Sequence, residues 1–322
     1  MQATRKPSKV FGFLVLFGAA VIFFLGLFRS LLAAPVDFPV PYHLTVDPGQ
    51  TLFSVSHELA ADHVITSPRL FEIFMISFGS EKKVSEGEYY FDQPQNALEV
   101  AMRISGRQFG IDRQKVTFPE GFSTKEMAAR LGATFPAFDT ELFLELAKDD
   151  QGRLFPDTYG FFPTVKPDLV LTTLKRTFVK KVPDFAVAVA ASGKTEHEIL
   201  TMASIIEKEA NGDEDRKIVA GILWKRISIG MPLQVDAPFL YLLGKESKEL
   251  TKKDLAMKSP YNTYINKGLP PTPINNPGLL AIEAALHPVE SPYLYYLHDS
   301  SGAIHYASTY KQHQANIQKY LK

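Results

Sequence analysis

Apolar residues recur every three or four positions along much of the chain, and this spacing is typical of amphipathic helices. It predicts helices over 51–60, 68–78, 96–104, 123–131, 140–148, 169–181, 195–210, 214–227 and 278–286, with a polar helix closing the chain. Short runs rich in β-branched and aromatic residues predict strands at 88–91 and 116–118, and a hairpin of 293–297 with 304–307. The expected fold class is therefore α+β.

One stretch near the N-terminus shows no alternation of polar and apolar positions. Residues 10–28 are uncharged, and three basic residues among the first nine precede them. Nineteen helical residues span ~28 Å, close to the hydrocarbon thickness of a bilayer, and a basic flank marks the cytoplasmic side. The sequence thus predicts a cytoplasmic tail over 1–9 and a single transmembrane anchor over 10–34.

A cleaved signal peptide is the alternative, because Ala33 and Ala34 resemble a cleavage site. Pro35 follows directly, and a proline at this position generally blocks the cut. An uncleaved anchor is therefore the favoured interpretation.

The rest of the chain divides into two parts. Prolines at 35, 39 and 41 predict an extended linker. A small α+β module is expected over 35–112 and a larger α+β domain over 113–322. Within the larger domain, residues 234–277 are rich in proline, glycine, asparagine and tyrosine. Long irregular segments of this kind often build binding sites on a rigid scaffold.

The composition argues against several classes of function. Lysine plus arginine and aspartate plus glutamate both number 35, a balance that argues against nucleic acid as a partner. The sequence contains no cysteine, which excludes thiolate nucleophiles and cysteine-based metal sites. Two His-Glu pairs, at 57–58 and 197–198, begin like zinc-protease motifs, but Ala61 and Thr201 stand where the second histidine belongs. Neither a metal nor another cofactor is expected.

One acidic side chain is directed toward the interior by the pattern of its helix. On a wheel of ~100° per residue, the apolar residues of 195–210 share one arc. Glu207 falls inside that arc, whereas Lys208 lies on the opposite face and Glu209 at the edge of the arc. Burial removes the solvation of a carboxylate and raises its pKa, so such a group can donate a proton to a glycosidic oxygen near neutral pH. In the alternative, Glu207 pairs with Arg216 or Arg226, or simply points out of a groove.

Several uncommon sequence words occur in order over residues 115–310. They read TFPEG at 117–121, LFPDTY at 154–159, MASIIEKEA at 202–210, GMPLQVD at 230–236, SPYNTY at 259–264, GLPPTPI at 268–274 and NPG at 276–278. Together they resemble the motifs of the endolytic murein transglycosylase family, MltG or YceG-like, whose catalytic segment reads ASIVEKE. The segment before residue 112 resembles, with weaker motifs, the LysM-like module of that family.

The resemblance implies a lytic cleavage of the MurNAc-β-1,4-GlcNAc bond in nascent peptidoglycan, with Glu207 as catalytic acid and base. The C6 hydroxyl of the same MurNAc would attack C1 and close a 1,6-anhydro ring. An intramolecular nucleophile gains a large effective molarity, so no second carboxylate is strictly needed. Asp236 is the only candidate partner carboxylate in the motif region, and we expect it to position the substrate or tune Glu207 if the two lie close together.

The same motifs supply the candidate substrate-binding residues, which are Gln234, Asp236, Tyr261, Asn262, Thr263 and Tyr264. The tyrosines offer faces for stacking on sugar rings, and the asparagine and threonine offer hydrogen bonds to hydroxyl or N-acetyl groups. In the alternative, the tyrosines only pack beneath an ordered loop. The family further implies an inner-membrane protein with an extracytoplasmic catalytic domain that works beside peptidoglycan synthases.

The sequence departs from the family pattern at three places. Residues 237–239 read APF where a PTV-like continuation is usual, residues 225–227 read KRI where NRL is usual, and Thr272 replaces a common glycine. These departures affect the fine shape of the groove more than the chemistry.

Two other functions are compatible with the residues. A water-using muramidase needs another carboxylate at ~5 Å or ~6.5–9.5 Å from Glu207. A non-catalytic wall-binding or divisome scaffold needs no reactive carboxyl, so Glu207→Gln would leave its cellular role intact.

Overall fold

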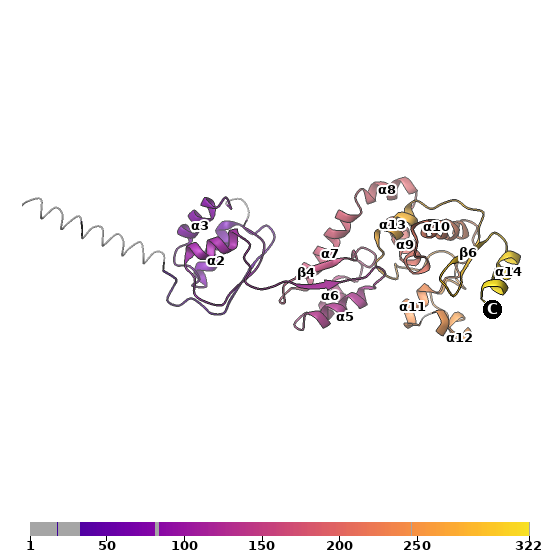
Figure 1. Ribbon diagram of the computed structural model, residues 1–322, viewed down its shortest axis with the longest axis horizontal. Coiled ribbons are helices and arrows are strands. Elements are labelled where there is room, and N and C mark those ends of the chain that lie inside the picture. The colour runs from indigo at the N-terminus through magenta and orange to yellow at the C-terminus, as the bar shows by residue number, and fades with distance from the viewer. Residues whose placement is uncertain (1–17, 19–32, 81–83, 246, 322) are drawn as a thin grey trace, which may run out of the picture. The chain divides into compact units, whose positions relative to one another are not determined.

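The computed structural model describes residues 18, 33–80, 84–245 and 247–321 (Figure 1). The chain divides into two compact units, Met1–Arg113 and Gln114–Lys322. Among the described residues, no helix has the length and apolar character needed to cross a bilayer. The predicted cytoplasmic tail lies outside the described residues, as does the predicted anchor over 10–34 apart from positions 18, 33 and 34.

The first unit pairs two short strands and packs three helices with them. Its elements are β1 (Tyr42–Val46), α2 (Leu52–Ala61), α3 (Pro68–Ser77), β2 (Gly87–Phe91) and α4 (Ala97–Ser105). The strands are antiparallel, with Tyr42 opposite Phe91 and Val46 opposite Gly87. The sequence pattern did not predict β1, although its alternation places Leu44 and Val46 in the core.

Helix starts in this unit follow local side-chain chemistry. Thr51 and Ser67 each accept a hydrogen bond from a backbone N–H of the first turn, and Asn96 forms a capping box with Glu99. The unit has its own core of sixteen buried residues, among them the fully buried Phe71. These sixteen residues form a hydrophobic core within the unit.

The second unit is mostly helical. Its elements are β3 (Gln114–Thr117), α5 (Thr124–Thr134), α6 (Thr140–Leu146), β4 (Thr158–Phe161), α7 (Pro167–Lys181), α8 (Phe185–Ser192), α9 (Glu196–Glu209), α10 (Asp213–Ser228), α11 (Ala237–Leu243), the short 3₁₀ turn η1 (Ser247–Glu249), α12 (Lys252–Leu255), α13 (Leu279–Leu286), β5 (Tyr295–His298), β6 (Ile304–Ala307) and α14 (Tyr310–Tyr320). The strand pairs β3–β4 and β5–β6 are both antiparallel.

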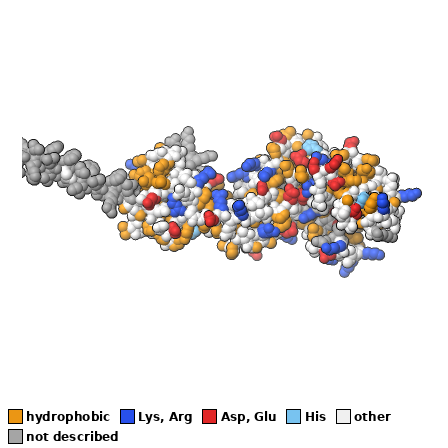
Figure 2. All heavy atoms as spheres, viewed as in Figure 1, with side chains coloured by type: hydrophobic (Ala, Val, Ile, Leu, Met, Phe, Trp, Pro, Cys, Tyr) orange, Lys and Arg blue, Asp and Glu red, His pale blue; other side chains and the backbone are white. Residues whose placement is uncertain are grey.

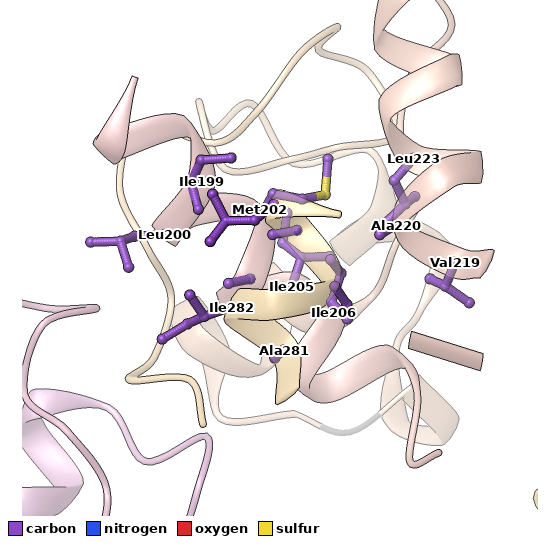
Figure 3. Close-up of a cluster of buried hydrophobic side chains, with 14 of the residues drawn as sticks. Ile199, Leu200, Met202, Ile205, Ile206, Val219, Ala220, Leu223, Ala281 and Ile282 are labelled. Carbon is purple, nitrogen blue, oxygen red and sulfur yellow. The ribbon is translucent and has the colours of Figure 1, made fainter. Parts of the chain in front are cut away.

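Two hydrophobic cores support this unit. One is formed by β3, β4 and helices α5 to α7, with residues between Val116 and Leu174. The other surrounds α9, whose apolar side chains pack against those of α10 and α13 (Figure 3). Acidic and basic side chains are interspersed on the displayed face of the chain (Figure 2).

The α+β class predicted from the sequence is confirmed, and so are the β5–β6 hairpin and the helix with a capping box at Thr195. Residues 234–277 are irregular as expected, but they also contain α11 and α12. Pro238 in the first turn of α11 and the capping box of Thr251 with Asp254 explain these short helices. Helix α8 was missed as well, because seven of its eight residues are apolar and show no helical period.

Candidate active site

Glu207 lies in the last turn of α9, the central helix of the second core. Ile199, Met202, Ile205 and Ile206 of this helix are fully buried (Figure 3). Their burial fixes the rotation of α9, because turning the helix would expose them to water. The Glu207 side chain is thereby held within the protein and is only 5% exposed.

Two donors from different segments hold the Glu207 carboxylate. Arg216 donates from Nη2 to Oε1 at 2.8 Å, and the backbone N–H of Gly278 donates to Oε2 at 2.8 Å. Arg216 is itself buried, and its Nε donates to the carbonyl of Ala210 at 3.1 Å. Of the two arginines considered from the sequence, Arg216 forms the ion pair, whereas Arg226 donates to backbone carbonyls elsewhere.

The electrostatic surroundings of Glu207 act in both directions. Burial raises its pKa above the ordinary value of 4.5 and is the largest effect. The Gly278 N–H and the charges of Arg216 and Lys208 oppose this rise, because each favours the carboxylate. The carboxylate of Glu120 raises the pKa further as a like charge. Burial and Glu120 therefore favour the protonated form of Glu207, whereas Gly278, Arg216 and Lys208 favour its carboxylate.

Glu120 is an acid of this site that the sequence reasoning missed. A Cβ built on Gly278 would lie 1.9 Å from Glu120 Oε1, so this carboxyl group fills the space beside Gly278. The next residue, Gly121, has φ +77°, and a Cβ there would lie 3.3 Å from the Glu207 Cγ. The available signal was the TFPEG word, the turn that carries Glu120, which resembled a family motif but gave Glu120 no role among the expected site residues.

Asn276 joins this turn to two other segments. It is fully buried and forms an antiparallel bridge with Phe122, in which Gly121 N donates to Asn276 O at 2.9 Å. Its side-chain Oδ1 accepts from Gly152 N at 2.7 Å and Leu154 N at 3.1 Å. Three of the sequence words, TFPEG, LFPDTY and NPG, are thus hydrogen-bonded together beside Glu207.

Two of the predicted substrate-binding residues are buried inside their loop. Asn262 donates from Nδ2 to the carbonyls of Leu255 and Met257 at 2.9 and 2.8 Å. Thr263 donates from Oγ1 to the Val235 carbonyl at 2.8 Å and accepts from the N–H of the same residue at 3.1 Å. These side chains hold the loop in shape, since their hydrogen bonds are made within the protein.

Gln234, Asp236 and Tyr264 lie on the same two segments but are less buried. Gln234 is exposed and has φ +53°, an uncommon backbone conformation for a residue other than glycine. Its N–H donates to the Thr263 carbonyl at 3.0 Å. The Tyr264 hydroxyl donates to Asp236 Oδ1 at 2.6 Å, and burial followed by this hydrogen bond raises the pKa of Tyr264.

Tyr261 lines a groove of about 670 Å³ together with Lys125 and Tyr241. Its hydroxyl is 2.8 Å from that of Thr272, the residue that replaces the usual glycine. A cleft of about 380 Å³ shares Lys125 and Tyr241 as lining residues and also includes Gly121. Of the residues that line the cleft, Gly121 lies against the candidate acid, since a Cβ on it would lie 3.3 Å from the Glu207 Cγ.

A second acid of α9, Glu209, faces a different set of groups. The Tyr296 hydroxyl donates to its Oε2 at 2.9 Å. Burial raises the pKa of Glu209 to about 7, and the charge of Asp236 contributes to the rise. Asp236, offered by the sequence as a partner of Glu207, thus exerts its charge on Glu209, whereas Glu120 is the acid that acts on Glu207.

A family model, curated proteins and a solved structure are similar to this chain. A model of the YceG-like family matches residues 44–319. The chain belongs to the YceG-like family. Among the family's relatives, the endolytic murein transglycosylase of Bacillus subtilis (strain 168) is 28% identical over 92% of this chain and 89% of its own length. The crystal structure of a yceG-like protein from Listeria monocytogenes is similar with a TM-score of 0.57 at 28% identity, covering 85% of this chain and 98% of that one.

A second YceG-like relative is the endolytic murein transglycosylase of Streptococcus pneumoniae serotype 2 (strain D39 / NCTC 7466), which is 32% identical over 177 residues. That alignment covers 53% of this chain but only 32% of the longer pneumococcal protein. The similarity to the Bacillus protein therefore extends over more of this chain than the similarity to the pneumococcal protein.

Proposed function

We propose that this chain is an endolytic murein transglycosylase, which cleaves MurNAc-β-1,4-GlcNAc bonds in nascent glycan strands and leaves 1,6-anhydro-MurNAc ends. The observation that carries the proposal is the Glu207 carboxyl, sheltered from water and with a raised pKa. A general acid must hold a proton near neutral pH and release it to the leaving oxygen. The names of the Bacillus and Streptococcus relatives support the same activity.

The reaction runs in two proton transfers through one side chain. Glu207 gives its proton to the glycosidic oxygen, the bond from that oxygen to C1 of MurNAc breaks, and the bonding electrons leave with GlcNAc. The C6 hydroxyl of the same MurNAc then attacks C1, and its proton passes to the Glu207 carboxylate. No water is consumed, and Glu207 ends the cycle protonated.

The two donors on Glu207 fit the middle of this cycle. Between the two transfers the group is a buried carboxylate, which is costly unless it is hydrogen-bonded or paired. Arg216 and the Gly278 N–H, both at 2.8 Å, offset that cost. Before the first proton transfer and after the second, burial favours the protonated form of Glu207.

Substrate contact is proposed for the exposed members of the motif segments. Gln234 is exposed with a constrained backbone, and Tyr261 lines the groove of about 670 Å³. Tyr264 with Asp236 lies on the adjoining turn. We assign Asn262 and Thr263 the supporting role of shaping this loop, because their polar atoms are already bonded.

We also propose that residues 10–34 anchor the chain in the inner membrane and that 35–112 form a LysM-like module. The uncharged run over 10–28 supports the anchor, and the separate core of the first unit supports an independent module. In this arrangement the catalytic unit works outside the cytoplasm on strands still close to the membrane. Peptidoglycan synthases would be natural partners, since they produce those strands.

The test is product analysis on uncrosslinked nascent glycan with the full-length chain in detergent. We expect new 1,6-anhydro-MurNAc ends by mass spectrometry. Glu207→Gln should reduce their formation about 1000-fold while the protein stays folded. Glu145→Gln, which removes an exposed acid on α6, is the matched control and should retain activity.

The same product analysis also tests the muramidase alternative, for which Glu120 is the candidate second carboxylate. A carboxylate beside Glu207 is what a hydrolase would use to activate water. Reducing-end MurNAc without anhydro product would therefore replace the lytic reaction with hydrolysis. Unchanged cell-wall function in a Glu207→Gln strain would instead favour a non-catalytic scaffold.

A further inference from the structure

The candidate active site contains a carboxylate that the proposed reaction does not yet use. Glu120 Oε1 lies where a side chain on Gly278 would begin, at 1.9 Å from the ideal Cβ position. The N–H of the same glycine donates to Glu207 Oε2 at 2.8 Å. The two carboxyl groups therefore lie against one residue, Glu207 at its nitrogen and Glu120 at its α-carbon.

The backbone that follows Glu120 is held by hydrogen bonds. Gly121 N donates to Asn276 O at 2.9 Å, and Asn276 N donates to Phe122 O at 2.8 Å. The Asn276 side chain adds a bond from Nδ2 to Phe122 O at 3.0 Å. Three hydrogen bonds thus hold the residues that follow Glu120 to the segment that leads into Gly278.

The Glu120 carboxylate has no ion pair or hydrogen bond within the described part of the chain. Arg216, the buried cation of the site, is engaged by Glu207 and by the Ala210 carbonyl. The Nζ of the exposed Lys208 lies 2.9 Å from the ideal Cβ position of Gly121. An exposed acid held in place beside a buried one, with its oxygens unoccupied, is available to a bound ligand. Repulsion between the two carboxylates raises the pKa of Glu207 and is the cost of this arrangement.

We propose that Glu120 is the second acidic group of the reaction centre, and that its carboxylate stabilises the positive charge developing at C1 of MurNAc during cleavage. The inference rests on the proposed function. The proton of Glu207 must reach the glycosidic oxygen within hydrogen-bond distance, and C1 is bonded to that oxygen. A substrate seated on Glu207 therefore brings C1 next to Gly278, where Glu120 lies.

In this scheme Glu120 forms no covalent bond and transfers no proton. Its negative charge is already in place when C1 loses the leaving oxygen, so little reorganisation accompanies the reaction. The C6 hydroxyl remains the nucleophile, and its proton still passes to Glu207. Glu120 acts most strongly where the sugar carries most positive charge, which is the transition state, so its effect belongs in kcat.

Glu120→Gln is the test, because glutamine keeps the shape that packs on Gly278 and removes only the charge. We expect kcat for anhydro-product formation to fall about 100-fold, with KM changed less than about twofold. The alkaline limb of the pH–rate profile should move to lower pH, because the like charge that raises the pKa of Glu207 is gone. Glu120→Asp, which keeps the charge but withdraws it, should recover part of the activity.

Glu145→Gln removes a charge of the same sign from the same unit and should change neither kcat nor the pH limb. A Glu120→Gln enzyme with wild-type kcat and an unmoved limb would overturn the proposal. A rise in KM alone would also overturn it, by showing a role only in binding. A wild-type chain that yields no anhydro product would instead refute the proposed function itself.

Gly278→Ala supplies a second, independent variant. Its Cβ would overlap the Glu120 carboxyl, so the carboxylate must move. We expect kcat to fall in the wild-type background and to fall little further in a Glu120→Gly background, where the overlap is absent. Equal losses in both backgrounds would show that Gly278 acts independently of Glu120, against the proposal.

Discussion

The Arg216 guanidinium lies 2.8 Å from Glu207 Oε1, and both side chains are more than nine-tenths buried. Such a pair contributes little net stability, because desolvating two charges offsets most of their attraction. Removing one partner is costly, since the other charge remains buried without compensation. The pair therefore matters chiefly for the protonation state and position of the Glu207 carboxyl.

Arg216→Met should lower the free energy of unfolding by about 3 kcal/mol. It should also move the alkaline limb of the pH–rate profile to higher pH, because the Arg216 charge lowers the pKa of Glu207. Urea unfolding and the pH dependence of kcat measure the two effects. Lys217→Met breaks the neighbouring exposed pair with Asp213 and should cost under about 0.5 kcal/mol. A stable Arg216→Met protein with an unmoved limb would contradict the prediction.

Glu209 predicts a pH dependence of stability. Its pKa is about 7 in the folded protein against an ordinary 4.5, so below pH 4.5 both states are protonated. Between these values the unfolded chain ionises while the folded protein keeps its proton, so stability falls as pH rises. Glu209→Gln should remove this fall, which we expect to be about 3 kcal/mol. Unfolding free energies at pH 4.5 and 7.5 check it; a variant with the wild-type slope would refute it.

Asn276 should be among the most sensitive positions of the second unit. Asn276→Ala deprives the N–H groups of Gly152 and Leu154 of their acceptor inside the protein. We expect a loss of about 3 kcal/mol, because buried donors without partners are costly. Asn266→Ala, at an exposed asparagine bonded to loop carbonyls, should cost less than about 1 kcal/mol. Thermal unfolding compares them, and equal losses would argue against the bridging role of Asn276.

Alanine variants of Gly121 and Gly302 together distinguish the cost of backbone strain from displacement of the Glu207 side chain. Gly121 has φ +77°, and a Cβ there would lie 2.9 Å from Lys208 Nζ and 3.3 Å from Glu207 Cγ. Gly302 has φ +86° but nothing within 4 Å of its Cβ position. Both alanine variants should lose about 1 kcal/mol of stability, whereas only Gly121→Ala should lose kcat, by about tenfold. Full activity in Gly121→Ala would show that the carboxyl of Glu207 tolerates displacement.

Local pattern in the sequence was sufficient to predict the helices and the inward direction of Glu207. The rotation of α9 follows from contacts three and four residues apart, which repeat along one helix and can be counted without a structure. Ile199, Met202 and Ile206 lie on the face that the wheel assigned to the interior. Short elements such as β1, α8 and α11 were missed, because a few residues carry too little periodic signal.

The partners of Glu207 were decided only by the tertiary structure. Arg216 is nine residues away along the chain, Gly278 is seventy-one away, and Glu120 lies on a turn of the other core. The sequence offered two arginines and gave Asp236 as the only candidate partner acid in the motif region, whereas in the structure Arg216 forms the ion pair and Glu120 is the acid whose charge acts on Glu207. Such contacts depend on how α13 and the Asn276 bridge pack against α9, and this packing has no local repeat from which it could be predicted.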